Sequence, residues 1–305
     1  MQNQFSRTQM LLGLPAINTL RGSRVAVFGV GGVGGYVVEV LARSGIGELD
    51  LFDNDRVSIT NINRQIVALN STIGKYKIDV AADRIHDINP DCIVHRYQMF
   101  YHPANADEID LSQFDYVVDC IDTVKAKLEL IRRCHRLGVP LISSMGAANK
   151  LDPTMFRVSD LSKTQMDPLA KVLRKTLRKE GITSLKVVYS EEPPLHPIKL
   201  ALNSTETDCS DSEMDATTAS GRREVPASNA FVPAAAGLIV GGEVVKDLIR
   251  FANTMRISPE ETSGNAAAEN AEKRAQEKIR LHETILQQQK EGKDPLKKVI
   301  KPLPI

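Results

Sequence analysis

Residues 24–34, which read RVAVFGVGGVG, contain the strongest fold signal in the sequence. The first five residues are mostly apolar and β-branched, which predicts a buried strand. The glycines that follow give a tight turn and bring the backbone close to a phosphate at the start of a helix. These glycines are Gly29, Gly31, Gly32 and Gly34. The segment therefore predicts a nucleotide-binding α/β domain.

Short apolar runs alternate with amphipathic stretches from residue 24 to residue 144. This alternation predicts strands separated by crossover helices, and so a mainly parallel sheet. The predicted strands are 24–29, 48–52, 92–98, 116–120 and 141–144, and the predicted helices are 32–44, 75–88 and 124–137. Two further helices are expected at 168–180 and 231–249. We expect one nucleotide-binding domain over residues 1–255.

The length, net charge and cysteine spacing of the chain argue against several classes of protein. The chain has 305 residues and a formal net charge of +1, so a nucleic-acid partner would have to bind a local basic patch. The four cysteines include no Cys-x-x-Cys pair, which argues against a zinc ribbon or a disulfide framework. Cys209 lies in a polar stretch that has no means of holding a nucleophile. No secretory signal opens the chain, so we expect a cytoplasmic protein.

Residues 231–249 are apolar enough to require a membrane test. Pro233 lies near the start of the segment, and Glu243, Lys246 and Asp247 lie inside it. A membrane span needs about 20 largely uncharged residues. The segment is therefore predicted to be a buried helix of the domain, with no membrane span.

Charged residues follow the glycine turn in an order that suits a triphosphate. Asp53 ends the second predicted strand, at the spacing of an acid that binds ribose hydroxyls. Arg64 offers a planar fork and Lys77 a point charge, which together can neutralise phosphates. Asp122 follows the fourth strand, where a carboxylate can hold Mg²⁺. Taken singly, Arg64 and Lys77 could be surface charges, and Asp122 could cap the helix that starts near residue 124.

The motifs together resemble the superfamily of ubiquitin-activating and sulfur-carrier-activating adenylyltransferases. The shared pattern is residues 29–34, Asp-x-Asp at 53–55, Asn-x-x-Arg-Gln at 61–65, Gly-x-x-Lys at 74–77 and Asp-x-x-Asp at 119–122. The resemblance implies a Rossmann-like ATP-binding fold, whose mainly parallel sheet is extended by antiparallel strands on the C-terminal side. It also implies ATP and Mg²⁺ as cofactors, with Arg64, Lys77 and Asp122 as catalytic residues and Asp122 on the metal. The remaining cofactor-binding residues are Asp53, Asp55, Asn61, Gln65 and Arg7.

Within this superfamily, residues 145–154 and 160–169 resemble the tRNA threonylcarbamoyladenosine dehydratases. Such enzymes would use ATP to activate the threonyl carboxylate beside the anticodon, which then closes into a ring. The resemblance also implies a homodimer, in which Arg7 reaches the ATP of the neighbouring subunit, and it leaves room for sulfur-relay proteins as partners. Residues 195–228, expected to form a mobile loop, and the charged helical tail 256–305 depart from the family.

The predicted helix 168–180 has a basic exposed arc that suits a tRNA backbone, although such arcs are usually only solvated. Its predicted tRNA contacts are Lys171, Arg174, Lys175 and Arg178. The main alternative function is an activator of a ubiquitin-like or sulfur-carrier protein. An NAD-dependent dehydrogenase would explain the glycine turn but would leave Arg64, Lys77 and Asp122 idle. A non-catalytic nucleotide sensor is the third alternative.

Overall fold

The computed structural model describes residues 2–198 and 226–256, and residues 276, 277, 279, 280, 283, 284, 286 and 287. A seven-stranded sheet with the order β3-β2-β1-β4-β5-β7-β6 forms its centre. The strands are β1 Arg24–Phe28, β2 Glu48–Phe52, β3 Ile93–Tyr97, β4 Tyr116–Asp119, β5 Leu141–Ser144, β6 Phe156–Asp160 and β7 Lys186–Ser190. The Rossmann-like α/β fold is therefore confirmed.

The sheet is parallel from β3 to β7, and β6 alone runs antiparallel to its neighbour. β7 continues the parallel sheet beside β5, and β6 pairs with β7 at the edge. The expected extension on the C-terminal side is thus one parallel and one antiparallel strand. All parallel strands end at the same edge of the sheet, which is where ligands of open α/β sheets bind.

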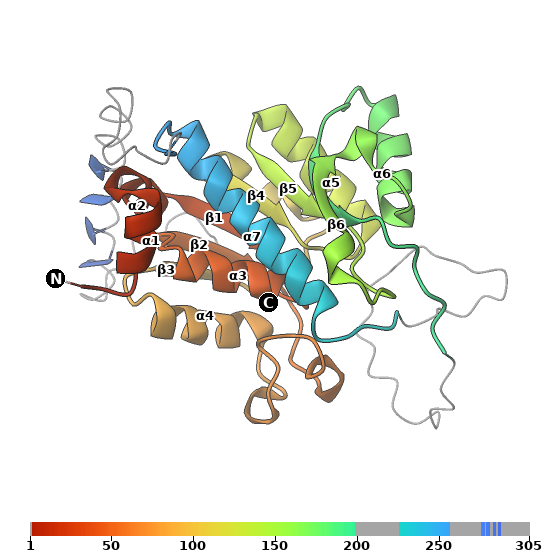
Figure 1. Ribbon diagram of the computed structural model, residues 1–305, viewed down its shortest axis with the longest axis horizontal. Helices are drawn as coiled ribbons and strands as arrows, with labels where there is room; N and C mark the ends of the chain where they lie inside the picture. The colour runs from red at the N-terminus through yellow and green to blue at the C-terminus, as the bar shows by residue number, and fades with distance from the viewer. Residues whose placement is uncertain are drawn as a thin grey trace.

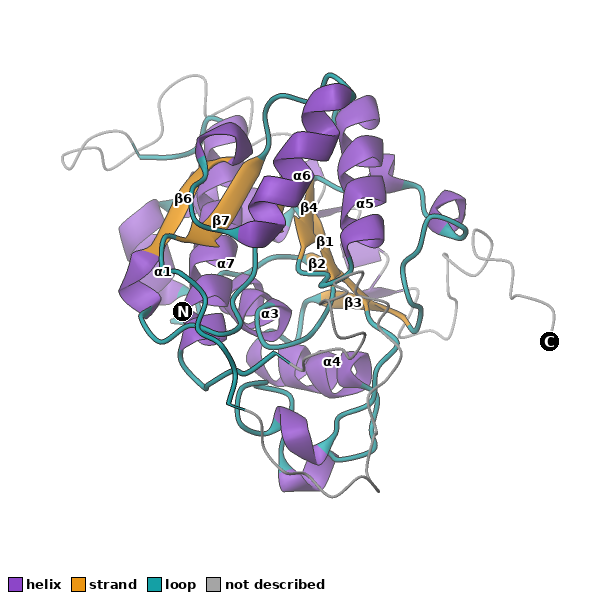
Figure 2. Ribbon diagram, turned by 90° about the vertical axis from the view of Figure 1, so that its right-hand side faces the viewer, coloured by secondary structure: helices purple, strands orange, loops and turns teal. Residues whose placement is uncertain are grey.

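Helices cover both faces of the sheet (Figures 1 and 2). The helices are α1 Ser6–Leu12, α2 Leu14–Arg21, α3 Gly34–Arg43, α4 Lys77–Ile88, α5 Val124–Leu137, α6 Pro168–Lys179 and α7 Val232–Phe251. Apolar side chains of α2, α3, α4 and α7 share one buried cluster with the sheet, whereas those of α5 and α6 pack on the other face. The apolar stripes of these helices supply the hydrophobic burial that holds the three layers together.

The C-terminal half of helix α7 carries charged side chains that form ion pairs and hydrogen bonds with the sheet. Lys186 of β7 forms ion pairs with Glu243 and Asp247, each at 2.7 Å. The hydroxyl of Tyr116 donates a hydrogen bond of 2.7 Å to Asp247 Oδ2. Among the described residues, no helix is apolar over enough length to cross a bilayer, and α7 is the buried domain helix that the sequence predicts.

The helices α1 and α2 and the strands β6 and β7 were not among the elements predicted individually. Gly13 and Pro15 interrupt the apolar spacing of residues 6–21, so the two short helices give no continuous helical pattern. Residues 199–225 of the loop predicted at 195–228 lie outside the described residues, and so does Cys209. Most of the tail 256–305 also lies outside them, so the proposed domain limits stay a prediction.

Candidate nucleotide-binding site

The glycine turn connects the carboxyl end of β1 to the start of α3. Gly29 has a φ of +89°, and a Cβ there would lie 2.8 Å from the backbone oxygen of Cys120. A Cβ on Gly34 would lie 1.8 Å from the oxygen of Gly29, so both positions require glycine. A Cβ on Gly31 would meet no atom within 4 Å. The turn is therefore closed on its protein side and open at Gly31, where a phosphate can approach the backbone.

Asp53 lies at the end of β2 beside this turn. Its carboxylate accepts hydrogen bonds from the backbone nitrogens of Val30, at 2.7 Å, and Asp55, at 2.8 Å. Burial raises the pKa of the Asp53 carboxyl above its usual range. Each carboxylate oxygen still has a free lone pair, so the group can accept ribose hydroxyls while it fixes the turn.

Lys77 is the first residue of α4 and only 5% exposed. Its Nζ lies 2.6 Å from Asp55 Oδ2, and its backbone nitrogen donates a hydrogen bond of 3.0 Å to the backbone oxygen of Asp55. An ammonium has three donors, so two remain for phosphate oxygens. Asp55 thus anchors Lys77. The resemblance implies that Asp55 contacts the nucleotide directly, which is a different role.

Arg64 lies next to the open part of the glycine turn. An ideal Cβ on Gly32 would be 3.6 Å from Arg64 Cγ, so the side chain runs along the turn. Its Nη1 donates to the backbone oxygen of Thr60 at 2.8 Å and to Asn63 Oδ1 at 2.9 Å. Burial lowers the pKa of Arg64, and no acidic partner faces it among the described residues. A guanidinium held without a counter-ion suits a phosphate.

Asn61 and Gln65 lie in the same segment but differ in what they do. Asn61 Oδ1 accepts a hydrogen bond of 3.1 Å from the nitrogen of Ser58, which closes the 3₁₀ turn Ile59–Asn61. Gln65 is 7% exposed, and its buried Oε1 has no hydrogen-bond partner among the described residues. Asn61 therefore shapes the segment, whereas Gln65 keeps an unused acceptor.

Asp122 follows β4 at the carboxyl edge of the sheet and is exposed. Its hydrogen-bond partner among the described residues is Thr123, whose hydroxyl donates to Oδ1 at 3.3 Å. Helix α5 has Thr123 at its N-cap and no side-chain cap, so the alternative role of Asp122 as a helix cap is wrong. An exposed carboxylate beside the turn fits Mg²⁺, which usually takes one or two carboxylates together with phosphate oxygens.

The model of the ThiF family matches residues 5–284. The chain belongs to the ThiF family. A Bacillus subtilis relative called tRNA threonylcarbamoyladenosine dehydratase is 45% identical over 261 residues, 84% of this chain and 99% of the relative. A Haemophilus influenzae protein of the same name is 44% identical over 186 residues, 58% of this chain and 71% of the relative.

The crystal structure of the Escherichia coli tRNA N6-threonylcarbamoyladenosine dehydratase in complex with ATP has the same fold as this ThiF-family chain. Its TM-score is 0.70 at 33% identity, and the match covers 82% of this chain and 95% of the other. The resemblance stated from sequence motifs is therefore confirmed at the level of family and fold. ATP binding by such a relative agrees with the open glycine turn described above.

Beneath the loop that carries Asp122 lies a buried group that sequence motifs did not reveal. Lys127 Nζ is 2.8 Å from Asp119 Oδ2, and both side chains are 0% exposed. Ser143 of β5 donates to the same oxygen at 2.5 Å, and the nitrogen of Ile121 donates to Asp119 Oδ1 at 3.1 Å. A lysine in an amphipathic helix is typical of a solvated face, so its burial could not be read from the sequence.

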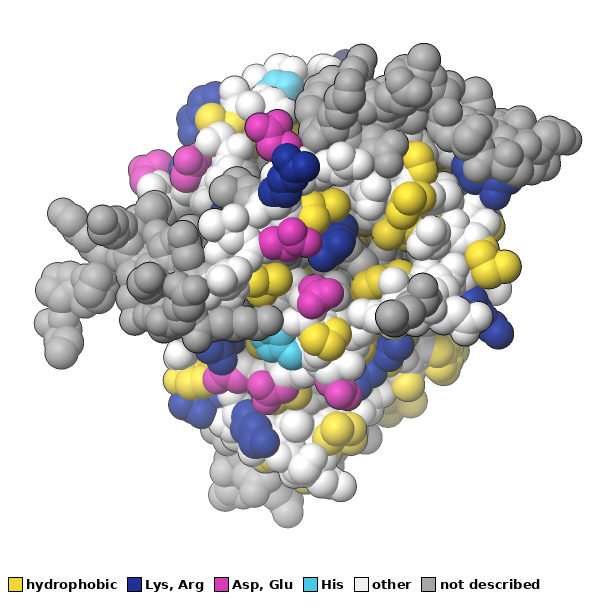
Figure 3. All heavy atoms as spheres, turned by 90° about the vertical axis from the view of Figure 1, so that its left-hand side faces the viewer, with side chains coloured by type: hydrophobic (Ala, Val, Ile, Leu, Met, Phe, Trp, Pro, Cys, Tyr) yellow, Lys and Arg dark blue, Asp and Glu magenta, His cyan; other side chains and the backbone are white. Residues whose placement is uncertain are grey.

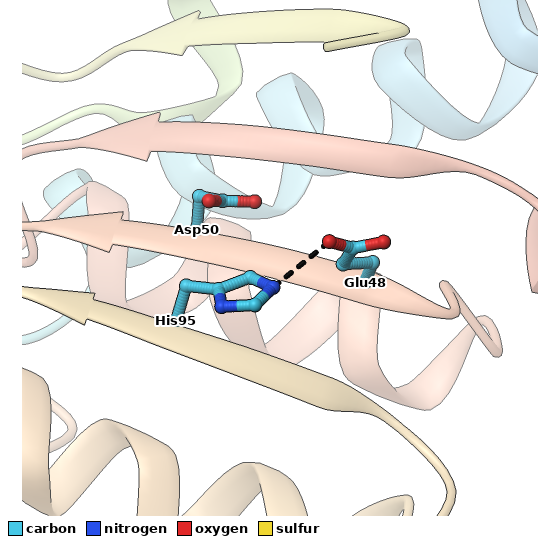
Figure 4. A group of neighbouring side chains, drawn as sticks. All are labelled: Glu48, Asp50 and His95. Atoms are coloured by element: carbon cyan, nitrogen blue, oxygen red, sulfur yellow. Dashed lines mark hydrogen bonds and ion pairs between the residues drawn. The ribbon is translucent and has the colours of Figure 1, made fainter. Parts of the chain in front are cut away.

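Another titratable cluster consists of Glu48, Asp50 and His95 (Figure 4). It lies toward the amino end of β2, whereas the glycine turn follows the carboxyl end of β1. Arg24 Nη2 is 2.8 Å from Asp50 Oδ1, and Arg24 Nε is 2.9 Å from Glu48 Oε1. His95 Nε2 lies 2.8 Å from the same Glu48 oxygen. Because a guanidinium already satisfies both carboxylates, this cluster is structural.

Of the four predicted tRNA contacts, the structure places Arg174 against its own fold and leaves the other three exposed. Arg174 is half-buried, and its Nη1 donates to the backbone oxygen of Thr164 at 2.8 Å and to Thr164 Oγ1 at 2.6 Å. This side chain therefore holds the turn before α6 and does not lie freely on the exposed arc. The exposed basic residues of α6 are Lys171, Lys175, Arg178 and Lys179. Arg7, in α1, is also exposed.

Proposed function

We propose that the protein is an ATP-dependent tRNA threonylcarbamoyladenosine dehydratase. The observation that carries this proposal is a glycine turn open at Gly31, with Arg64 beside it and the exposed Asp122 after the neighbouring strand. This arrangement suits a triphosphate with a divalent ion better than a dinucleotide. The similarity to dehydratases of known name along most of the chain supports the substrate.

The activation step explains why such a site needs cations. A free carboxylate is a poor acyl donor because its leaving group would be oxide. Transfer of a phosphorus group from ATP turns that oxygen into a phosphate-type leaving group. Arg64 and Lys77 would stabilise the charge that develops on the phosphates. Ring closure is intramolecular, so no side-chain nucleophile is required.

Mg²⁺ would be held by Asp122 together with phosphate oxygens, and it would neutralise charge on the transferred phosphorus. Within the described part of the chain, the Thr123 hydroxyl donates to Asp122 Oδ1, and Oδ2 is left for the ion. Lys77 stays in place without the ion, because Asp55 anchors it. The protein groups therefore orient the nucleotide, and the ion completes the charge balance.

A homodimer belongs to the same proposal. Helix α1 buries none of its seven residues, and Met10 and Leu11 are 81% and 68% exposed. Leu14, at the start of α2, is 49% exposed. Exposed apolar residues this close together favour a partner surface. A second copy on this side would cover them and would bring Arg7 toward the neighbouring site.

The exposed residues of α6 are proposed to bind the tRNA backbone. On the side of the molecule that carries α1 and α2, in contrast, acidic and basic side chains are interspersed (Figure 3).

We expect that Lys171→Glu, Lys175→Glu and Arg178→Glu together weaken tRNA binding about 10-fold or more and flatten its salt dependence, because each phosphate contact releases counterions. Filter binding over a salt series measures both. Arg96→Glu, on β3 at the other edge of the sheet, is the control, and an unchanged salt slope in the triple variant would contradict the assignment.

The function is tested with purified protein, Mg-ATP and unfractionated tRNA. We expect threonylcarbamoyladenosine to lose the mass of one water, and ATP to be consumed in step with that loss. Nucleoside mass analysis measures the first quantity, and nucleotide chromatography the second. ATP consumption triggered instead by a small carrier protein would support the activator alternative. Sulfur-relay proteins are partners to be added in the same assay.

A further inference from the structure

Asp167 has one carboxylate oxygen that nothing in the described structure uses. It precedes α6 as its N-cap, and its Oδ1 accepts a hydrogen bond of 2.8 Å from the nitrogen of Ala170. The residue is 4% exposed, and its buried Oδ2 has no hydrogen-bond partner among the described residues. The N-cap accounts for Oδ1 only. A buried acceptor without a partner costs about 1–3 kcal/mol, so the burial of Oδ2 needs another explanation.

The free oxygen faces the carboxyl edge of the sheet. Gly146 comes two residues after the end of β5, and an ideal Cβ there would lie 3.9 Å from Asp167 Oδ2 and within 4 Å of no other atom. β5 is the parallel neighbour of β4, which Asp122 follows. A small gap beside Gly146 therefore lies against Asp167 Oδ2, which is itself buried.

The turn that carries Asp167 is held rigidly. Arg174 binds Thr164 from the first turns of α6, and the nitrogen of Asp167 donates to the oxygen of Gln165 at 2.7 Å. Met166 between them has a φ of +60°, a conformation that side chains other than glycine adopt at a cost. Several contacts therefore fix the carboxylate at one place, as a reacting group requires.

Two charged groups act on Asp167 from the elements around it: Lys150 and Lys127 of α5. Lys150 is 4% exposed, and its Nζ donates to the backbone oxygen of Glu192 at 2.7 Å. Burial raises the pKa of the Asp167 carboxyl, while Lys150 and Lys127 oppose this rise. Lys150 keeps donors for an oxygen of a bound group, beside a carboxylate that needs a donor. The two side chains fit a ligand that has an N–H next to a carbonyl.

A carbamoyl group has this pattern, and its ring closure must release a proton. If a carbamoyl nitrogen attacks the activated acyl carbon, that nitrogen forms the new bond and loses its hydrogen. If the carbamoyl oxygen attacks, a C=N bond forms and the adjacent nitrogen loses its hydrogen. In both cases the C–O bond to the phosphate-type group breaks, and that group leaves with the electron pair. One N–H proton needs an acceptor whichever atom attacks.

We propose that Asp167 Oδ2 accepts this carbamoyl N–H proton and that Lys150 orients the carbamoyl oxygen. This proposal rests on the proposed dehydratase function and adds a general base to it. The base is separate from the residues that handle ATP, so activation of the carboxylate and closure of the ring depend on different side chains. Asp167 lies beside the end of β5 and the start of α6, whereas the nucleotide would lie over the ends of β1 and β4.

Asp167→Asn tests the proposal without removing the helix cap, because the Asn oxygen can accept from Ala170 as Asp does. We expect ring closure to fall at least about 100-fold, the usual contribution of a general base. Activation should persist, so hydroxylamine added with Mg-ATP and tRNA should trap a threonyl hydroxamate at near wild-type yield. Asp110→Asn, at another N-capping aspartate, is the matched control, and it should behave as wild type.

The pH profile gives a second readout. Ring closure by the wild type should decline as the pH falls through the Asp167 pKa, and Asp167→Asn should lack this limb. Gly146→Ala adds a methyl in front of the oxygen with no clash in the fold, so it should also impair closure but not hydroxamate formation. Near wild-type closure by Asp167→Asn would overturn the proposal and leave the function intact. A wild type that closes no ring would instead refute the proposed function.

Discussion

Lys77→Met is expected to lower the rate of ATP-dependent ring closure by about 100- to 1,000-fold, the usual effect of losing one charged donor from a water-excluded site. The ammonium is 5% exposed and anchored at 2.6 Å from Asp55, so it is preorganised to meet phosphate oxygens. Methionine keeps the length of the stem and removes the charge. Single-turnover assays with Mg-ATP and modified tRNA measure the rate, and hydroxylamine trapping should fall equally because activation itself is impaired.

The fold should tolerate this change. Asp55 loses its partner, but its side chain is 34% exposed and can be solvated, so the free energy of unfolding should change by about 1 kcal/mol or less. Lys75→Met, at an exposed position two residues earlier in the chain, is the matched control and should keep its activity. If Lys77→Met activated the carboxylate at the wild-type rate, the phosphate role of this residue would be wrong.

The parallel part of the fold follows from the sequence because each of its elements has a complete local pattern. β2, β5 and α5 have the predicted bounds, since apolar runs or stripes and flanking polar residues mark both of their ends. β6 has no such pattern: Arg157 and Val158, in its middle, are exposed at the edge of the sheet. Its pairing with β7 depends on contacts across the sheet edge, which residue spacing does not encode.

The site was predictable where chemistry follows a strand end, and less so where side chains meet across the fold. Arg64 and Asp122 lie beside the glycine turn as the motifs suggest, because parallel strands end at one edge. Asp55, in contrast, pairs with Lys77, and Arg174 turns from the helix surface to bind Thr164. Spacing along the chain gives the position of a charged group but not the partner that it meets. For the same reason the sequence predicts Asp167 as a helix cap but does not predict its buried, unpaired oxygen.

Lys127→Met is expected to destabilise the protein by about 3–5 kcal/mol, since removal of one partner leaves a buried charge without its counter-ion. Asp119 and Lys127 are both 0% exposed, so water cannot solvate the carboxylate that remains. Ser143 alone would still donate to the oxygen that Lys127 leaves. Urea unfolding followed by circular dichroism measures the change in the free energy of unfolding.

The double variant Asp119→Asn with Lys127→Met separates the cost of an isolated charge from the contribution of the pair. The asparagine oxygen can still accept from the nitrogen of Ile121, its amide nitrogen can donate to the Ser143 hydroxyl, and no charge stays buried, so most of the lost stability should return. The Asp122 loop depends on the hydrogen bond between Asp119 and the nitrogen of Ile121. The double variant should therefore bind ATP more tightly than Lys127→Met alone. Equal stability of the single and double variants would show that an isolated buried charge is not what destabilises Lys127→Met.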